Sequence, residues 1–371
     1  MELTVDTKAL HKVLSVLIKG VPNKPVLPIL DNFLVSVLDG KMMIMSFDNE
    51  ISLYAEIQPK EVNGSAQIAI PAKLMTTLVS AMPDGELKII YVDGASNIQF
   101  DWQSGNSTLP VFDAKDFPLR IMASSIESSI CYSQAFLKSA LAKTCTIILE
   151  NENRPAISGV FFDVRKDGSS IVGSDGGMLV CVDSPVTGDM KMIVPLRAAN
   201  LIKSMLEKSG DVKIVTDGKV AEFDFGKYLV QTLLIGAKYP NYRNVIPLQN
   251  PYVLCANREL LDAAIKRVMI CADKASMMIR LKLSYNEVQL IGEDLGFQYT
   301  ANETLACEYD GEDLEIGFKA PAIHALISNL ECSDVEIKFK ASNQATLIVP
   351  AGDQIKDETV NSVIMPMNLV K

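Results

Sequence analysis

The sequence contains few of the residues from which most active sites are built. It has two histidines and one tryptophan among 371 residues, and aromatic residues make up 6% of the chain. Neither His11 nor His324 has a potential metal ligand at helical spacing, and no phosphate-binding loop, dinucleotide fingerprint or nucleophile elbow is present. Carboxylate pairs such as Asp48 and Glu50 have no spacing that completes a metal site. We therefore expect no catalytic residues, no metal and no cofactor, and we expect that the chain is not an enzyme.

Paired cysteines and long apolar runs are missing as well. The seven cysteines lie at least fourteen residues apart, so no CxxC pair exists, and scattered cysteines are typical of reduced thiols. No stretch approaches the roughly eighteen apolar residues of a membrane-spanning helix. The acidic segment 1–6 also differs from the basic start of a secretory signal. These features predict a cytoplasmic protein without a membrane partner.

Basic residues are outnumbered, but they are not spread evenly. The chain has 35 basic and 45 acidic residues, a net charge of −10 and a pI near 4.9. Taken as an average, this balance argues against nucleic acid as a partner. The average hides the pattern, because basic residues gather in segments that repeat along the chain.

Three segments recur at one period of about 124 residues, in the same order. The first is an amphipathic helix that follows an N-cap residue (Asp6, Ser133 or Asn257) and has apolar residues at offsets 3, 4, 7 and 8. The second is another apolar-striped helix, and the third is a strand beginning near 85, 210 or 333. Alternating strand patterns broken by turn residues fill the spaces between them. Repeats of this kind indicate one structural unit used three times.

The repeat predicts an α+β fold of three similar domains. Each domain is expected to have two helices packed on antiparallel sheet, because strand patterns outnumber helical ones. The expected domains are 1–125, 126–248 and 249–371.

The expected helices carry most of the unbalanced positive charge. Together they contain thirteen basic and three acidic residues, which leaves 22 basic and 42 acidic residues elsewhere. In the first helix Lys8, Lys12 and Lys19 lie on the side opposite the apolar stripe. The expected helices span 7–19, 72–82, 134–145, 196–208, 258–270 and 319–330.

Two interpretations of this charge remain open. An ordinary solvated helix face usually mixes both signs of charge, so an almost acid-free set favours a polyanionic partner. Few aromatic residues accompany the basic ones, which disfavours binding by base stacking, and no base-reading motif is present. The favoured interaction is contact with phosphates, without sequence preference.

Seven short motifs in order resemble those of the bacterial DNA polymerase III beta subunit family, the beta sliding clamps. They extend over essentially the full chain: 24–30 (KPVLPIL), 70–73 (IPAK), 108–110 with 116–118 (TLP, DFP), 194–197 (VPLR), 239–243 with 245–247 (YPNYR, VIP), 315–318 (EIGF) and 365–369 (MPMNL). The resemblance implies a head-to-tail homodimeric ring of six similar domains, with helices lining the hole and sheets outside. It also implies a processivity factor that encircles double-stranded DNA and tethers the replicative polymerase.

The resemblance also assigns residues to sites. The DNA-binding residues that it implies are Lys24, Lys73, Arg154, Arg197 and Arg280. For the dimer interface it implies Ile270 and Cys271 at the end of the fifth helix. The implied pocket for partner peptides consists of Ile157, Ser174, Gly176, Gly177, Met178, Leu179, Pro240, Val245, Val363, Met365 and Met367.

The pocket is expected to receive short extended peptides with a glutamine and a Leu/Phe pair, carried by the replicative polymerase, the clamp loader and repair proteins. This sequence has Gly177 and Met178 where relatives usually have a histidine and a basic residue, so a less positive entrance is expected. Beside Arg154 it has 155–156 (Pro-Ala) where relatives often have aromatic residues. The last segment can equally be a strand that closes the third sheet.

The sequence leaves two alternatives to a sliding clamp. One is an enzyme of nucleic-acid metabolism with a basic substrate groove, which would need a metal or acid/base cluster. The other is a non-enzymatic repeat scaffold for protein interactions, in which the basic helices are incidental.

Overall fold

One structural unit, a strand, a helix and three further strands, organises the chain. The computed structural model describes residues 1–118, 128–352 and 358–369. Within these residues the unit occurs six times, and the helices begin close to the positions that the sequence predicts.

The six units have the following bounds. The first two contain β1 (Glu2–Asp6), α1 (Thr7–Leu17), β2 (Asn32–Leu38), β3 (Lys41–Phe47) and β4 (Ile51–Ile57), then β6 (Ala66–Pro71), α2 (Ala72–Ser80), β7 (Glu86–Ile90), β8 (Asn97–Trp102) and β9 (Gly105–Pro110). The next two contain β11 (Ser128–Ser133), α3 (Gln134–Cys145), β12 (Gly159–Arg165), β13 (Gly168–Ser174) and β14 (Met178–Ser184), then β15 (Met190–Pro195), α4 (Leu196–Met205), β16 (Asp211–Thr216), β17 (Val220–Asp224) and β18 (Tyr228–Leu233). The last two contain β19 (Tyr252–Asn257), α5 (Arg258–Val268), β20 (Met278–Ser284), β21 (Glu287–Asp294) and β22 (Tyr299–Ala306), then β23 (Leu314–Lys319), α6 (Ala320–Ser328), β24 (Asp334–Phe339), β25 (Thr346–Ala351) and β26 (Thr359–Ile364).

Short elements lie between the units. Two are strands, β5 (Glu61–Asn63) and β10 (Phe112–Asp113). The others are 3-10 turns: η1 (Ile18–Gly20), η2 (Pro28–Asp31), η3 (Ala114–Asp116), η4 (Pro155–Ile157), η5 (Tyr242–Val245) and η6 (Met269–Cys271).

The repeat extends to individual hydrogen bonds. Each third of the chain contains two helices, and a strand (β7, β16 or β24) follows the second helix. The N–H of the first residue of the first helix donates to the carbonyl of the residue just before that strand. The N···O distance is 2.9 Å in all three cases: Thr7 to Gly85, Gln134 to Gly210 and Arg258 to Ser333. The sequence period is therefore a structural period as well.

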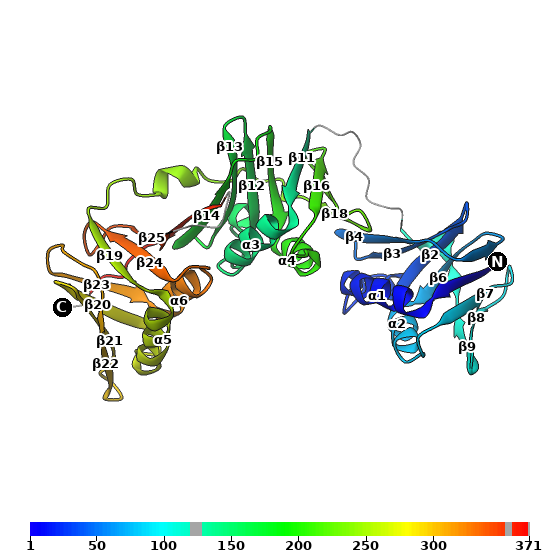
Figure 1. The fold of residues 1–371 in the computed structure, drawn as a ribbon, viewed down its shortest axis with the longest axis horizontal. Helices are drawn as coiled ribbons and strands as arrows, with labels where there is room; N and C mark the ends of the chain where they lie inside the picture. Colours follow the sequence, from blue (N-terminus) through cyan, green and yellow to red (C-terminus); the bar gives the residue numbers. More distant parts are fainter. Residues whose placement is uncertain (119–127, 353–357, 370–371) are drawn as a thin grey trace. The chain divides into compact units, whose positions relative to one another are not determined.

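Local chemistry explains where these helices begin and which face they bury. The Asp6 carboxylate accepts from the Ala9 N–H at 2.8 Å, and the Asn257 amide oxygen accepts from the Leu260 N–H at 3.1 Å. Each satisfies one of the backbone donors left open at a helix N-terminus. Of the apolar stripe predicted for α1, Leu10, Val13 and Leu14 are buried, while Ala9 is exposed. Figure 1 shows α1 and α2 side by side against the strands of the first third.

The strands form four antiparallel sheets. Their orders are β5-β1-β7-β8-β9, β10-β6-β2-β3-β4-β18-β17-β16-β11, β15-β12-β13-β14-β26-β25-β24-β19 and β22-β21-β20-β23. Each of the two large sheets joins strands from different thirds of the chain, through β4 with β18 and through β14 with β26. An α+β fold with helices packed on antiparallel sheet is confirmed.

The chain divides into two compact units, and each unit is made of two stretches that are separate in the sequence. One contains 1–134 and 204–234, and the other contains 135–203 and 235–371. The expected division into three domains stays a prediction. Its first boundary, near residue 125, lies outside the described residues.

Candidate functional site

The first helix presents lysines on the side away from its packing face. Lys8 and Lys12 are exposed, while Leu10 and Val13 are buried. Lys19, in η1, donates from Nζ to the Ser204 hydroxyl at 3.2 Å. Among the described residues, no carboxylate lies within ion-pair distance of these three ammonium groups. The predicted basic face of this helix is confirmed.

Three of the residues expected to bind DNA are exposed on or near helices. Lys24 lies in the coil between η1 and η2, and Lys73 and Arg197 are the second residues of α2 and α4. At these positions their long side chains can extend into solvent beside the helices. Their contact with DNA stays a prediction.

Several basic residues of α3 and α5 are paired with acids. In α5, Lys266 Nζ lies 2.7 Å from an Asp262 carboxylate oxygen, and Arg267 pairs with Glu303 of β22. In α3, Lys143 is buried and forms an ion pair with Glu358 at 2.8 Å. The excess positive charge is therefore not shared equally by the six helices, and α1 carries two exposed lysines, Lys8 and Lys12, with no carboxylate at ion-pair distance among the described residues.

Arg280 lies on the opposite face of its sheet from the helices. It alternates along β20 with Ile279 and Leu281, both fully buried, and alternate strand residues point to opposite faces. Its guanidinium donates to Glu315 Oε1 at 2.9 Å and to Glu293 Oε1 at 2.5 Å. A cavity of about 530 Å³ beside these groups is also lined by residues of the C-terminal tail. This position does not agree with the expectation that Arg280 lies among DNA-facing residues.

Arg154 lies at the rim of the expected peptide pocket. It directly precedes η4, and its Nη1 is 3.0 Å from the place that a Cβ on Gly176 would take. Gly176 has φ of +92°, which only glycine adopts without strain, so backbone conformation and space both favour glycine here. Arg154 is thus placed beside the pocket by the structure, whereas the resemblance assigns it to DNA.

The C-terminal tail leaves β26 and continues as extended chain. The Met365 N–H donates to the Gly177 carbonyl at 3.0 Å, and the Met367 N–H donates to the Gly317 carbonyl at 2.8 Å. Gly317 permits this approach, because a Cβ there would lie 3.0 Å from Leu369 Cδ2. β26 lies inside its sheet, between β14 and β25, so the expectation that the last segment is a strand closing the third sheet is wrong. Met365, half of which is exposed (50%), follows β26 beside the β13–β14 turn.

A tight turn forms the entrance beside Met365. One Asp175 carboxylate oxygen accepts from the N–H groups of Gly177 and Met178, at 2.8 and 2.6 Å. The Ser174 hydroxyl donates to the Met178 carbonyl at 2.7 Å and accepts from the Gly176 N–H at 3.1 Å. Because Gly177 has no side chain and Met178 is apolar, the turn itself contributes no positive charge to the entrance.

Three of the other predicted pocket residues belong to, or pack against, one apolar cluster. Leu179 of β14 and Val363 of β26 are buried in this cluster and are paired residues on neighbouring strands. Ile157 of η4 packs against the cluster. Tyr239, which precedes Pro240, is also a member, and Val245 ends η5 on the same loop with its side chain half exposed. The structure therefore brings Ile157, Leu179 and Val363 together, whereas the pocket as a whole stays a prediction.

Three aromatic residues of this cluster were not predicted as pocket residues. Phe161 of β12 and Tyr239 stack with ring centroids 4.4 Å apart, and Tyr242 packs edge-on against both rings. The Tyr242 hydroxyl donates to Asp163 Oδ2 at 2.8 Å. Burial, together with this carboxylate, raises the pKa of Tyr242 to about 12, so the phenol stays a neutral donor. The apolar run in 160–162 was the available signal, because continuous apolar residues indicate a strand covered on both faces.

The residues expected at the dimer interface follow α5. Ile270 and Cys271 lie in η6, where Ile270 is 78% exposed and Cys271 is half-buried. Nearby exposed apolar residues lie at the β21–β22 turn, where Phe297 and Tyr299 stack and Lys274 lies over the Phe297 ring. An isoleucine exposed to this degree is available for contact with another molecule.

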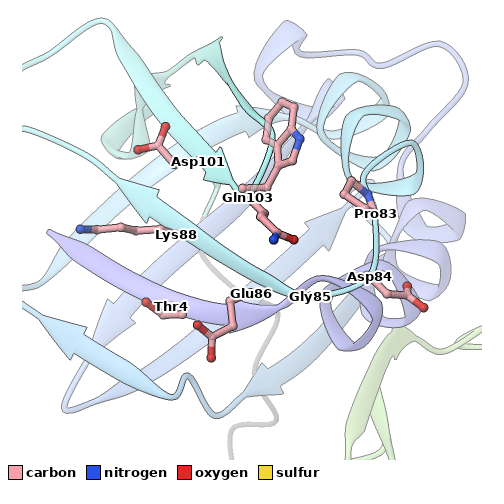
Figure 2. A pocket seen from close by; sticks show the side chains of 9 residues that line it. Thr4, Pro83, Asp84, Gly85, Glu86, Lys88, Asp101 and Gln103 are labelled. Carbon is pink, nitrogen blue, oxygen red and sulfur yellow. The ribbon is translucent and has the colours of Figure 1, made fainter.

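A second cavity, of about 510 Å³, lies in the first third of the chain (Figure 2). Lys88 and Asp101 line it from neighbouring strands, and Glu86 lies at the start of β7. Two of its charged groups are engaged in ion pairs, Lys88 with Glu2 at 2.7 Å and Glu86 with Lys60 at 2.8 Å. We assign no ligand to it.

No cluster that could hold a metal ion is found in the described part of the chain. Residues 1–118, 128–352 and 358–369 contain no group of three His, Cys, Asp or Glu side chains that could hold a metal ion. Over the same residues, no helix has the length and apolarity needed to cross a membrane. All seven cysteines are free thiols.

Family models match both ends of the chain. The N-terminal domain of the DNA polymerase III beta subunit matches residues 1–121, and the C-terminal domain matches residues 243–368. Together these matches span more than half of the sequence. The chain belongs to the DNA polymerase III beta subunit family.

Curated relatives and solved structures agree with this family over the full length. The beta sliding clamp of Pseudomonas putida is 25% identical over 377 residues, which cover 100% of both chains. The beta sliding clamp of Escherichia coli K12 is 25% identical over 326 residues, 86% of this chain and 87% of that protein. A crystal structure of the Pseudomonas aeruginosa clamp bound to griselimycin has a TM-score of 0.93 at 23% identity, covering 100% of both chains, and confirms the fold.

Family membership identifies the class of function. Members are processivity clamps, which are non-catalytic subunits of a DNA polymerase, so the expectation that this chain is not an enzyme is confirmed. The alternative of a general interaction scaffold is not favoured.

Proposed function

We propose that two copies of this chain close into a ring around double-stranded DNA, without sequence preference, and tether a replicative polymerase to its template. Two observations together carry the proposal. The chain belongs to the DNA polymerase III beta subunit family, and the only charged residues on the exposed face of α1 are lysines. A polymerase held on such a ring rebinds before it can diffuse away, because tethering raises its effective concentration.

The number of helices fits a dimer. Neighbouring helices pack about 10 Å apart, so six helices around a circle would leave almost no hole. Twelve helices give a circle about 38 Å across and a hole of roughly 28 Å once helix width is removed. Duplex DNA, about 20 Å wide, passes only through the larger ring, with room for water and mobile ions.

The proposed DNA surface consists of exposed basic side chains near the helices. It includes Lys24, Lys73 and Arg197, together with Lys8 and Lys12 of α1. Contacts of this kind bind phosphate oxygens and are weakened by salt, so they hold DNA without fixing its register. The proposal leaves out Arg280, which two glutamates neutralise.

The proposed homodimer is formed through the end of α5. Ile270 is apolar and exposed in the single chain, and Cys271 lies beside it. Association would remove the Ile270 side chain from water, which is the ordinary driving force of such interfaces.

The proposed partner site is the pocket around the C-terminal tail. Short extended peptides of the replicative polymerase, the clamp loader and repair proteins would place a Leu/Phe pair against the cluster of Leu179 and Val363. Two methionines of the tail, Met365 and Met367, provide flexible and polarisable walls that suit varied ligands. Arg154 at the rim is the positive group available to an acidic flank.

Deletion of residues 365–371 tests the partner site. The deletion removes one wall of the pocket but leaves α5 and η6 intact, so peptide binding should be lost while the dimer remains. Binding of a fluorescent Gln-x-Leu-x-Phe peptide is measured by anisotropy, and the dimer by sedimentation. Full affinity in the deleted protein would place the peptide site elsewhere.

A cytoplasmic location is part of the proposal. It is supported by the seven free thiols, as expected of a protein in a reducing compartment.

A further inference from the structure

The cavity of about 530 Å³ around Arg280 is lined by more negative than positive charge. Its charged lining residues are Arg280 of β20, Glu293 of β21 and Glu315 of β23, one cation and two anions. Lys282 is not a lining residue, and its Nζ lies 4.0 Å from Glu315 Oε2, at the outer limit of an ion pair. The cavity therefore favours a cationic ligand over an anionic one.

The hydrogen bonds of these groups point to the same chemistry. Arg280 donates to Glu315 Oε1 at 2.9 Å and to Glu293 Oε1 at 2.5 Å, so its guanidinium is engaged within the protein. A carboxylate can accept about four hydrogen bonds, so both glutamates can accept further donors. Their side chains are 38% and 36% exposed, which leaves them accessible to a ligand.

The uncharged lining suits a long basic side chain. Met278 and Leu369 provide apolar surface, and Asn343 and Asn368 provide amide oxygens that can accept hydrogen bonds. Lysine and arginine place an aliphatic stem on apolar surface while the charged head stays at a polar site. A stem on Met278 and Leu369, with its head at the glutamates, would use both parts of the lining.

The C-terminal tail connects this cavity to the proposed partner site. Met365 is hydrogen-bonded to the β13–β14 turn through Gly177, Met367 is hydrogen-bonded to Gly317 of β23, and Asn368 lines the cavity. An extended chain advances about 3.3 Å per residue, so Asn368 lies about 10 Å along the tail from Met365. A peptide that follows the tail can therefore reach both places.

The two ends of this track differ in charge. Arg154 lies beside Gly176 at the β13–β14 turn, next to Met365, whereas Glu293 and Glu315 lie at the Asn368 end. Opposite charges at the two ends would favour one direction of a bound peptide and disfavour the reverse, because the wrong direction brings like charges together.

We propose that the cavity of Glu293 and Glu315 is a subsite of the partner site and takes an arginine or lysine side chain of the bound peptide. The basic residue lies about three residues from the peptide residue beside Met365, in keeping with the 10 Å separation. This inference rests on the proposed partner site and adds the charge that its peptides carry at one end.

An arginine scan of the peptide tests the subsite. Arginine replaces in turn each flanking residue of a fluorescent Gln-x-Leu-x-Phe peptide whose flanks are otherwise alanine, and anisotropy with the full-length protein gives each Kd. We expect arginine on one flank only, at about the third residue, to tighten binding roughly two- to fivefold at low salt. The gain should diminish as salt is added.

Protein variants assign the gain to the cavity. Glu293→Gln should reduce the arginine gain and leave the Kd of the all-alanine peptide unchanged. Glu287→Gln is the matched control, because Glu287 is an exposed residue on the same face at the other end of β21, and it should keep the gain. Arg280→Gln should increase the gain, because both glutamates lose their internal cation; a purely structural role of these residues would not give opposite signs. Urea unfolding checks that each variant is folded.

Each result has a distinct consequence. If the all-alanine peptide binds but arginine gives no gain at any position, this inference is overturned and the partner site stands. A gain that Glu293→Gln leaves intact, or that Arg280→Gln abolishes, would equally overturn the assignment to this cavity. If no peptide binds the folded protein, the proposed partner site falls and this inference with it.

Discussion

Replacing Ile270 is the sharpest test of the dimer, because this side chain contributes little to the single chain. Ile270 lies in η6 and is 78% exposed, so its removal should leave the free energy of unfolding nearly unchanged. If the proposed interface covers it, removal should weaken association strongly. A change in dimer affinity without a change in stability is the signature expected of an interface residue.

The size of the effect follows from burial and symmetry. Fully burying an isoleucine side chain contributes about 1.5–3 kcal/mol. A closed dimer has two identical junctions, so Ile270→Ala acts twice and should cost about 3–6 kcal/mol of association free energy. Because about 1.4 kcal/mol corresponds to a tenfold change, the dimer Kd should rise roughly 100- to 10,000-fold. Ile270→Asp should have a larger effect, since a carboxylate would be buried without a partner.

Sedimentation velocity over a concentration series measures this Kd. Leu260→Ala is the matched control, because Leu260 is also largely exposed (61%) but lies in the first turn of the same helix, away from η6. Urea unfolding of each variant checks that stability is retained. An unchanged dimer Kd for Ile270→Asp, with a folded protein, would refute the reasoning.

Three other changes have defined outcomes. Lys143 and Glu358 form a buried ion pair (side chains 4% and 1% exposed), so Lys143→Met or Glu358→Gln alone should lower the urea-derived free energy of unfolding by about 3–5 kcal/mol. The double variant Lys143→Met with Glu358→Gln should recover most of this loss, because it leaves no unpaired buried charge. A double variant that loses as much stability as the two single variants added together would contradict the account. Reversal of Lys24 and Lys73 to glutamate should weaken DNA binding and reduce the slope of log affinity against log salt by roughly two; an unchanged slope would remove them from the DNA surface. Met178→Arg should raise the affinity for peptides with acidic flanks relative to Met178→Leu, and equal affinities would show that the entrance charge is unimportant.

The helices and the repeat could be predicted from the sequence because their signals are local. N-cap residues and a 3.6-residue apolar period mark α1 and α5 within a few residues of their starts. The predicted ends were less accurate, since 7–19 and 258–270 each combine an α-helix with the following 3-10 turn, η1 or η6. Helix ends often tighten in this way, and the apolar period does not distinguish the two forms.

Contacts between distant segments could not be predicted. Lys143 was counted with the exposed basic residues because its partner, Glu358, is far away in the sequence. Arg280 was assigned to DNA by resemblance, but two carboxylates on the neighbouring strands β21 and β23 neutralise it. The pairings of β4 with β18 and of β14 with β26 likewise depend on tertiary structure.

The candidate peptide pocket was predicted only through the resemblance. Its residues come from η4, the β13–β14 turn, the loop after β18 and the tail, which no local pattern connects. The aromatic cluster of Phe161, Tyr239 and Tyr242 was overlooked, although the apolar run of β12 indicated that both faces of that strand are covered.

The most direct test of the central claim is retention on DNA of defined topology. The protein is loaded by its clamp loader onto a nicked circular duplex, freed of unbound protein by gel filtration, and assayed again after the circle is cut once. A closed ring that slides should stay with the circle at a salt concentration that screens phosphate contacts, and it should leave the ends of the linear form. Equal retention on circular and linear DNA would contradict the account, because binding would then depend on surface contact and not on encirclement.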